Sequence, residues 1–167
     1  MRNDIRFERI SLAEGLSQSV VMSILQDRRG FMWFCTQDGL NRYDGYVFKE
    51  YRHVEGDPAT LSDSFVRTAA EGAGDVVWLG TNSGGLNRLD LATGNITHYR
   101  NDPDDPDSLS NNVVADVLED DQGIVWIATL GGGLNRLDPD AGNVVRYQND
   151  PEDPESLAHD TVWSILQ

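Results

Sequence analysis

The chain has 167 residues, of which 39% are hydrophobic and 25% are charged, the balance of a globular domain with a hydrophobic core. Its 28 acidic and 13 basic residues give a net charge of −15, and a surface of that sign repels nucleic acid and anionic lipid headgroups. The single cysteine cannot form a disulfide within the chain, and no apolar run approaches the roughly 18–20 residues that cross a bilayer.

An internal repeat organises the chain. Leu16, Leu61, Leu109 and Leu157 each open a copy, at spacings of 45, 48 and 48 residues. A tryptophan follows the opening leucine after 17 residues in each of the first three copies, and the second and third copies are identical at 23 of 48 positions. Four short strands recurring every 40 to 50 or so residues are typical of the blades of a β-propeller.

The predicted strands are short, rich in valine, isoleucine, tryptophan and tyrosine, and separated by glycine, asparagine and aspartate turns. In chain order they are expected at residues 5–10, 20–25, 31–36, 40–43, 46–51, 65–70, 76–81, 86–90, 96–99, 113–118, 124–129, 134–138, 144–147 and 161–166. No helix is predicted.

The sequence therefore predicts an all-β fold of four-stranded antiparallel propeller blades. The expected parts are an outer strand at 5–10, blades at 16–60, 61–108 and 109–156, and the inner strand of a fourth blade within 157–167. A propeller can close when its N-terminal strand completes the last blade. Here that blade would lack two strands, so we expect the chain to be the opening portion of a longer ring.

Several motifs resemble the two-component regulator propeller repeats of bacterial signalling proteins. They are Leu-Ser, Asn112-Val113 before an inner strand, an Asp-x-x-Gly turn, Trp-x-x-Thr and Gly-Gly-Leu-Asn-Arg-Leu-Asp. The stretches 14–33 and 38–45 resemble the start of such a propeller. Cys35 and Ala128 depart from the family glycine that Gly80 keeps, and residues 72–75 replace the usual acidic turn.

This resemblance implies a ligand-sensing ring of about seven blades. The remaining blades and a downstream histidine kinase or diguanylate cyclase module would be its partners, with an unknown small molecule or oligosaccharide as ligand. It also implies a periplasmic or other extracytoplasmic location. Residues 1–6 lack the apolar core of a secretory signal.

The chemistry-bearing residues favour structural roles. Trp33, Trp78 and Trp126 each stand two residues before a small side chain on the same strand face, which favours packing between blades over stacking on a sugar. The Asp- and Pro-rich connectors could offer carboxylates to a hard cation, but aspartate and proline also build rigid turns. The three histidines share no ligand spacing. We predict no catalytic residue, no metal site and no cofactor, and a small buried side chain at Cys35.

One face of the blades is the candidate for ligand binding. In a four-stranded meander, the connectors between blades and the turns between second and third strands emerge together. The connectors at 52–63, 100–112 and 148–160 hold twelve of the 28 acidic residues, and loops on a rigid scaffold concentrate binding residues. The candidate ligand-binding residues are Gln37, Asp38, Asn82, Ser83, Asn112 and Asp160.

Three functions from different classes fit these observations. The first is the ligand-sensing, non-catalytic part of a bacterial signalling receptor. The alternatives are a propeller enzyme such as a lyase and a protein-interaction scaffold. We also expect the chain by itself to self-associate, because both ends of the blade stack would present open strand edges.

Overall fold

The computed structural model of the chain describes residues 9–167. In this part of the chain, twelve strands form three antiparallel sheets with the sequential orders β1-β2-β3-β4, β5-β6-β7-β8 and β9-β10-β11-β12. The strands are β1 (Val21–Gln26), β2 (Met32–Thr36), β3 (Gly39–Tyr43), β4 (Phe48–Tyr51), β5 (Val66–Glu71), β6 (Val76–Thr81), β7 (Leu86–Asp90), β8 (Ile96–Tyr99), β9 (Val114–Glu119), β10 (Val125–Thr129), β11 (Leu134–Asp138) and β12 (Asn143–Tyr147). Each sheet is an up-and-down meander, which confirms the predicted all-β blades.

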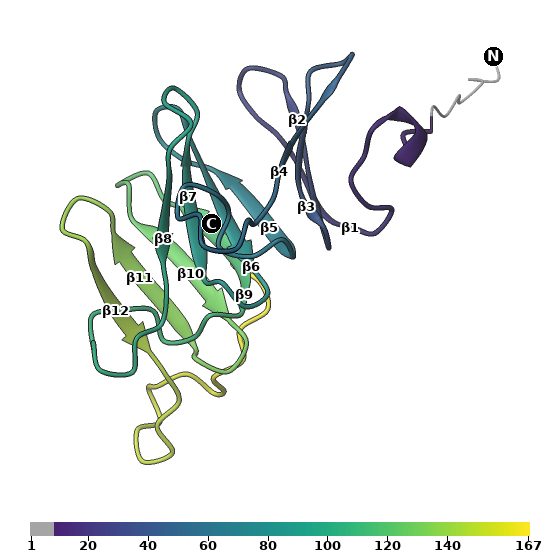
Figure 1. Ribbon diagram of the computed structural model, residues 1–167. Coiled ribbons are helices and arrows are strands. Elements are labelled where there is room, and N and C mark those ends of the chain that lie inside the picture. The colour runs from purple at the N-terminus through teal and green to yellow at the C-terminus, as the bar shows by residue number, and fades with distance from the viewer. Residues whose placement is uncertain (1–8) are drawn as a thin grey trace, which may run out of the picture.

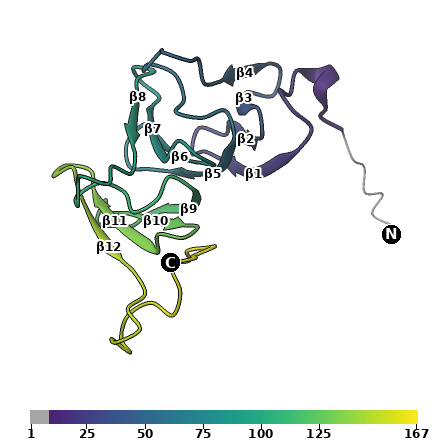
Figure 2. The ribbon, with the colours of Figure 1, turned by 60° about the horizontal axis from the view of Figure 1, so that its bottom comes forward.

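The three blades stack beside one another (Figure 1). Figure 2 shows them in an arc, with the first strand of each blade, β1, β5 and β9, on its inner side and the fourth strand outside. Blades 1, 2 and 3 are the names used below for these sheets in chain order.

The inner strand of every blade contains a β-bulge at the same repeat position. The register shifts between Val21 and Ser23, between Val66 and Thr68, and opposite Ala128 and Thr129 in blade 3. The additional residue is Met22, Arg67 or Ala115. A bulge bends the strand and increases its twist, so the three inner strands begin in one shared geometry.

Hydrophobic side chains fill the two seams between blades. Trp33 and Trp78 are fully buried, whereas Trp126 of blade 3 is half-buried. Small residues in the second strands admit side chains of the next blade: a Cβ atom at Gly80 would lie 2.6 Å from Val114 Cγ1. The burial of these two tryptophans confirms the predicted packing between blades, in which a large and a small residue lie on the same packed face.

Two hydrogen-bonded pairs explain why the repeat keeps its polar residues. The amide oxygen of Asn87 accepts from the backbone N–H of Ser62 at 2.8 Å, and its amide nitrogen donates to the Ser62 hydroxyl at 2.6 Å. The Thr81 hydroxyl donates to the Gly85 carbonyl at 2.8 Å. Both arrangements recur in the other two blades. The Leu-Ser, Trp-x-x-Thr and Leu-Asn motifs therefore satisfy buried polar groups within each blade.

The start of the described chain holds one element that the sequence analysis did not predict. It is a single 3₁₀ turn, η1 (Leu12–Glu14), capped by the Ser11 hydroxyl and the Glu14 carboxylate. One turn is too short to show a hydrophobic period. Residues 5–8 of the predicted outer strand 5–10 lie outside the described residues, and Ile10 is not in a strand.

The segment 161–166, predicted as an inner strand, does not form a ladder. It makes one bridge, between Leu130 and Thr161. The Asp116 carboxylate accepts from the Ser164 hydroxyl at 3.2 Å and from the Ile165 N–H at 3.0 Å. The segment thus runs beside β9, where Figure 2 shows it in yellow. Beyond this antiparallel bridge, no described strand continues alongside the segment, so a ladder does not form.

Among the residues that the structure describes, no helix has the length and apolar character needed to span a membrane.

Candidate functional site

The connector face is the face formed by residues 52–63, 100–112 and 148–160 and by the turns after β2, β6 and β10. On this face a repeated set of hydrogen bonds, called the clasp below, joins each blade to the next. In the second connector, the Asn112 side chain accepts from the Asn101 N–H at 2.8 Å. Its backbone carbonyl accepts from the N–H of Gly85 in the preceding turn at 3.0 Å. The clasp therefore fixes both a connector and a turn.

The same clasp is present in the other two connectors. Ser64 takes the place of Asn112 at the end of the first connector, where its hydroxyl accepts from the His53 N–H at 3.1 Å. In the third, the Asp160 carboxylate accepts from the Asn149 N–H at 2.7 Å, and the Asp160 carbonyl from the Gly133 N–H at 2.6 Å. Two predicted ligand-binding residues, Asn112 and Asp160, thus have structural partners.

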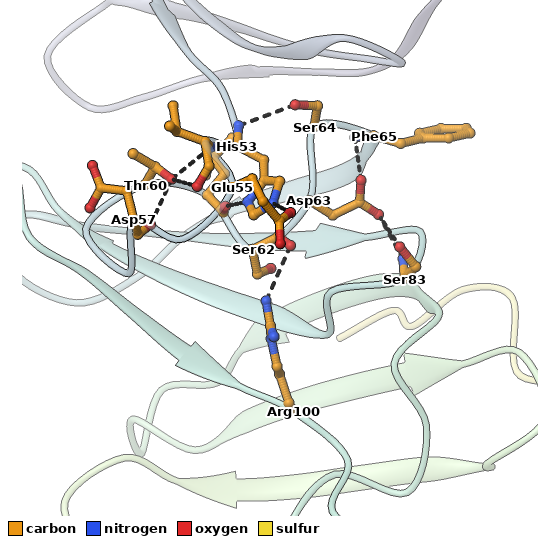
Figure 3. A network of polar contacts seen from close by, with 12 residues as sticks. His53, Glu55, Asp57, Thr60, Ser62, Asp63, Ser64, Phe65, Ser83 and Arg100 are labelled. Atoms are coloured by element: carbon orange, nitrogen blue, oxygen red, sulfur yellow. Dashed lines mark hydrogen bonds and ion pairs between the residues drawn. The ribbon is translucent and has the colours of Figure 1, made fainter.

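Among the other candidates, two already contact neighbouring charged residues. The Asp38 carboxylate forms an ion pair with the Arg52 guanidinium at 3.2 Å. The Ser83 hydroxyl and N–H both donate to the Asp63 carboxylate, at 2.7 and 2.8 Å. Figure 3 shows this last pair at the edge of the first connector. Ser83 remains exposed, so it can still reach a ligand.

The remaining two candidates lie in the turns that follow β2 and β6. Gln37 is exposed and has no hydrogen bond from its side chain within residues 9–167. The Asn82 amide oxygen accepts from Arg67 Nε at 3.0 Å, and the Arg67 guanidinium lies 5.4 Å from the ring centre of Phe65. The structure thus places Asn82 and Ser83 together beside blade 2, whereas Gln37 and Asp38 lie at blade 1.

Sequence reasoning missed Arg67, which lies at the bulge of β5. Its counterparts in the repeat are Met22, Ala115 and Trp163, four side chains of different chemistry at one position. A side chain that differs between copies, while the valine before it repeats at Val21, Val66 and Val114, is not required by the packing that all blades share. This variation is visible when the repeats are aligned, and it could have identified position 67 as a candidate for ligand binding.

The first connector is held by three titratable or cationic side chains. His98 Nε2 donates to the Thr60 carbonyl at 2.8 Å, and His53 Nδ1 donates to the Leu61 carbonyl at 2.7 Å. Arg100 Nη2 donates to the Ser62 carbonyl at 3.2 Å. Figure 3 shows His53 and Arg100 approaching this stretch from opposite sides. Three successive carbonyls are satisfied by side chains, so these residues fix the connector.

A shallow cavity of 300 Å³ lies over the same connector. It is lined by His53, Glu55, Asp57, His98 and Arg100 together with Gly56 and Pro58. The hydrogen bond to the Leu61 carbonyl and the nearby Glu55 carboxylate raise the pKa of His53 above its ordinary value. The cavity thus combines cationic and anionic groups on the candidate face.

The aspartates of the second and third connectors build turns. Asp102 and Asp105 each accept from the backbone N–H two residues later, at 3.0 and 2.9 Å. Asp150 and Asp153 do the same in the third connector. Within residues 9–167, no group of three or more His, Cys, Asp or Glu side chains is arranged to hold a metal ion.

The motifs that build these blades match a known family. The sequence model of the two-component regulator propeller matches residues 15–38 and 108–131, the inner and second strands of blades 1 and 3. In these two stretches the chain matches the two-component regulator propeller repeat. The resemblance predicted from the sequence is thereby confirmed.

A solved structure agrees with these two-component regulator propeller repeats. The extracellular domain of the hybrid two-component system BT3049 from B. thetaiotaomicron covers 94% of the chain with a TM-score of 0.84 and 30% identity. Histidine kinase P4 of Formosa agariphila is 45% identical over 56 residues, 34% of the chain. The chain spans 22% of the former and 4% of the latter.

An enzyme shares the architecture of the two-component regulator propeller repeats. Virginiamycin B lyase from Staphylococcus aureus covers 79% of the chain with a TM-score of 0.58 and 19% identity. At that identity, the similarity concerns the fold alone.

Proposed function

We propose that the chain is a non-catalytic, ligand-sensing part of the extracytoplasmic region of a bacterial signalling receptor of the two-component or diguanylate cyclase type. The observation that carries this proposal is the match of 94% of the chain to the extracellular domain of a hybrid two-component system. The ligand would be a small molecule or an oligosaccharide.

The positions of the residues that hold each blade together support ligand binding at the connector face. The repeated residues Ser62, Thr81 and Asn87 are bound within their blade. Side chains that differ between repeats, such as Gln37 and Arg67, occupy the turns and bulges of the connector face. A rigid scaffold with variable loops at one face suits recognition without turnover.

The enzymatic alternative rests on the fold of the lyase. A general acid or base needs an atom that can give or take a proton within hydrogen-bond reach of the substrate. His53 Nδ1 and His98 Nε2 both donate to carbonyls of the first connector, and His53 Nε2 lies 3.3 Å from the Glu55 carboxylate. This arrangement favours a structural role for the histidines of the candidate face.

The test is a ligand screen on the whole 167-residue chain. Soluble oligosaccharides and small metabolites would be screened by thermal shift, and each hit measured by calorimetry. We expect Gln37→Ala, Ser83→Ala and Arg67→Ala to weaken binding at least tenfold. Asn95→Ala, an exposed residue in the turn between β7 and β8 on the opposite face, is the matched control.

Two results would contradict the proposal. One is a hit whose affinity is unchanged by all three variants. The other is the appearance of a cleaved or eliminated product by mass spectrometry, which would favour the lyase alternative. The absence of product together with loss of binding in the variants would support sensing.

A further inference from the structure

The turns between first and second strands make a second repeated contact, on the face opposite the connectors. Glu71 at the end of β5 accepts from the Arg28 N–H of the blade 1 turn at 3.0 Å. Glu119 at the end of β9 accepts from the Ala73 N–H of the blade 2 turn at 2.8 Å. Each seam is therefore bridged by a glutamate of the following blade.

At the seam between blades 1 and 2, two arginines close the remaining space. Arg28 Nε pairs with Glu71 at 3.0 Å, and the Arg29 guanidinium pairs with Asp75. The Asp27 carboxylate accepts from the Trp33 indole N–H at 2.8 Å. The cavity left there is 140 Å³.

At the seam between blades 2 and 3, the side chains equivalent to Asp27, Arg28 and Arg29 are absent or reduced to a methyl group. Gly72, Ala73 and Gly74 stand at the repeat positions of Asp27, Arg28 and Arg29. Glu119 now receives the Trp78 indole N–H, at 2.5 Å. The cavity at this seam is 330 Å³, more than twice as large as at the first seam.

One arginine lining this larger cavity differs from its counterpart in blade 1. Arg42 lies over the Phe31 ring, 4.5 Å from its centre. Arg88 lines the cavity, and Val76 replaces the phenylalanine beneath it. Within residues 9–167 the Arg88 guanidinium has no hydrogen bond, ion pair or aromatic partner, and the Asp90 carboxylate of the same blade accepts from turn N–H groups instead.

The rest of the lining carries the opposite charge. Glu119, Asp138 and Asp140 contribute carboxylates, and Gln122 an amide. The Glu119 oxygens also accept from the Ala73 N–H and the Trp78 indole, and Asp138 from turn N–H groups, whereas the Asp140 carboxylate has no hydrogen bond or ion pair within residues 9–167. One guanidinium and three carboxylates match a ligand that carries an anionic group and a cationic group. At about 30 Å³ per water molecule, the cavity has room for roughly eleven non-hydrogen atoms, the size of a dipeptide.

We propose that the seam between blades 2 and 3 binds a dipeptide-sized zwitterion, whose carboxylate pairs with Arg88 and whose ammonium group is held by Asp140 in the negative field of Glu119 and Asp138. The site lies on the face opposite the connectors, so it does not depend on the proposed sensing site. Its chemistry suits free dipeptides or peptide ends, because both charges must be present on a short molecule.

The test uses the whole chain and L-alanyl-L-alanine as the probe, with binding followed by the NMR resonance of the Trp78 indole N–H. We expect a saturable shift of that resonance. The N-acetylated dipeptide lacks the ammonium group and the dipeptide amide lacks the carboxylate, so both should bind at least tenfold more weakly.

Arg88→Gln should weaken binding of the dipeptide at least tenfold, while Arg136→Gln, the equivalent change in blade 3, should leave it unchanged. Ala73→Arg gives a second variant, because an arginine there can pair with Glu119 as Arg28 pairs with Glu71 and fill the cavity. The unshifted resonances of the other indoles report that each variant is folded.

Three results would overturn the proposal. They are the absence of a saturable shift up to tens of millimolar dipeptide, equal binding of either singly charged analogue, and unchanged binding in both Arg88→Gln and Ala73→Arg.

Discussion

At the residue scale, a side chain's chemistry follows from its place in the blade. Cys35 occupies the small-residue position of β2, where Gly80 and Ala128 stand in the other blades, and it is fully buried. Burial disfavours the charged thiolate and raises the pKa of the Cys35 thiol to about 12. The thiol is thus a packing group in the folded chain.

The first prediction concerns the reactivity of this thiol. Because the thiolate is the reactive form, we expect Cys35 in the folded chain to resist a thiol reagent such as DTNB at pH 8. One thiol per chain should react at once after unfolding in guanidinium chloride. Rapid reaction of the folded chain would show that the seam between blades 1 and 2 opens readily.

The second prediction concerns His53, whose pKa is raised first by its hydrogen bond to the Leu61 carbonyl and then by Glu55. A raised folded pKa means that protonation stabilises the fold: this contribution is fully present below the ordinary value of 6.5 and is lost as the pH rises through the folded value. We expect Glu55→Gln to lower the pKa of His53 without returning it to the ordinary value, since the Leu61 contact remains.

NMR titration of the His53 ring would measure that change. Glu152→Gln, an exposed change in the third connector, is the control and should leave the titration of His53 unaltered. An identical His53 titration in Glu55→Gln and the unaltered chain would rule out the Glu55 contribution.

At the element scale, the seams depend on matched large and small side chains from neighbouring strands. Val114 of β9 packs over Gly80 of β6, where a Cβ atom would lie 2.6 Å from both Val114 Cγ1 and Thr68 Cγ2. Such a distance is well inside van der Waals contact, so the glycine is required by the approach of Val114 in β9 and Thr68 in β5 and not by its own backbone conformation.

The third prediction follows from this packing. We expect Gly80→Ala to lower the free energy of unfolding by about 1–3 kcal/mol through overpacking, measured by urea denaturation. Val114→Ala removes one of the opposing methyl groups, so the double variant should lose less than the sum of the single losses. Additive losses would show that β9 moves away from Gly80 without cost.

At the scale of the whole molecule, each terminal blade has one sheet face without another described sheet on it. On blade 1, Met22 and Ile24 of β1 are 40% and 57% exposed. Near the other end, Trp126 is half-buried although its equivalents are buried, and Trp163 is 68% exposed. Apolar side chains of this kind, beside unpaired strand edges, favour association with another chain.

The fourth prediction is that the 167-residue chain self-associates. Sedimentation velocity at several concentrations should show a concentration-dependent increase in mass. Ile24→Asp should reduce the association, while Val54→Asp, a similarly exposed change in the first connector, should not. A monomer at all concentrations with a cooperative unfolding transition would contradict this prediction.

Blade architecture could be predicted because its signals are local. Fixed intervals between leucine, tryptophan and tyrosine located all twelve strands of the three blades, with ends within two residues of those observed. Hairpin strands lie close together in sequence, so glycine turns and alternating apolar residues specify their pairing. The same signals predicted a strand at 161–166, where the structure has a single bridge, because a ladder also requires a neighbouring strand.

The structural role of each polar residue was decided only by the tertiary structure. Asn112 and Asp160 were predicted to bind a ligand, and the fold gives them inter-blade hydrogen bonds. Glu119 meets Trp78 across 41 residues of sequence, and Arg88 of blade 2 lines a cavity whose other wall is formed by Gln122, Asp138 and Asp140 of blade 3. Such contacts join different repeats, so a residue's role depends on what the neighbouring blade places opposite it, and one repeat read alone contains no record of that neighbour.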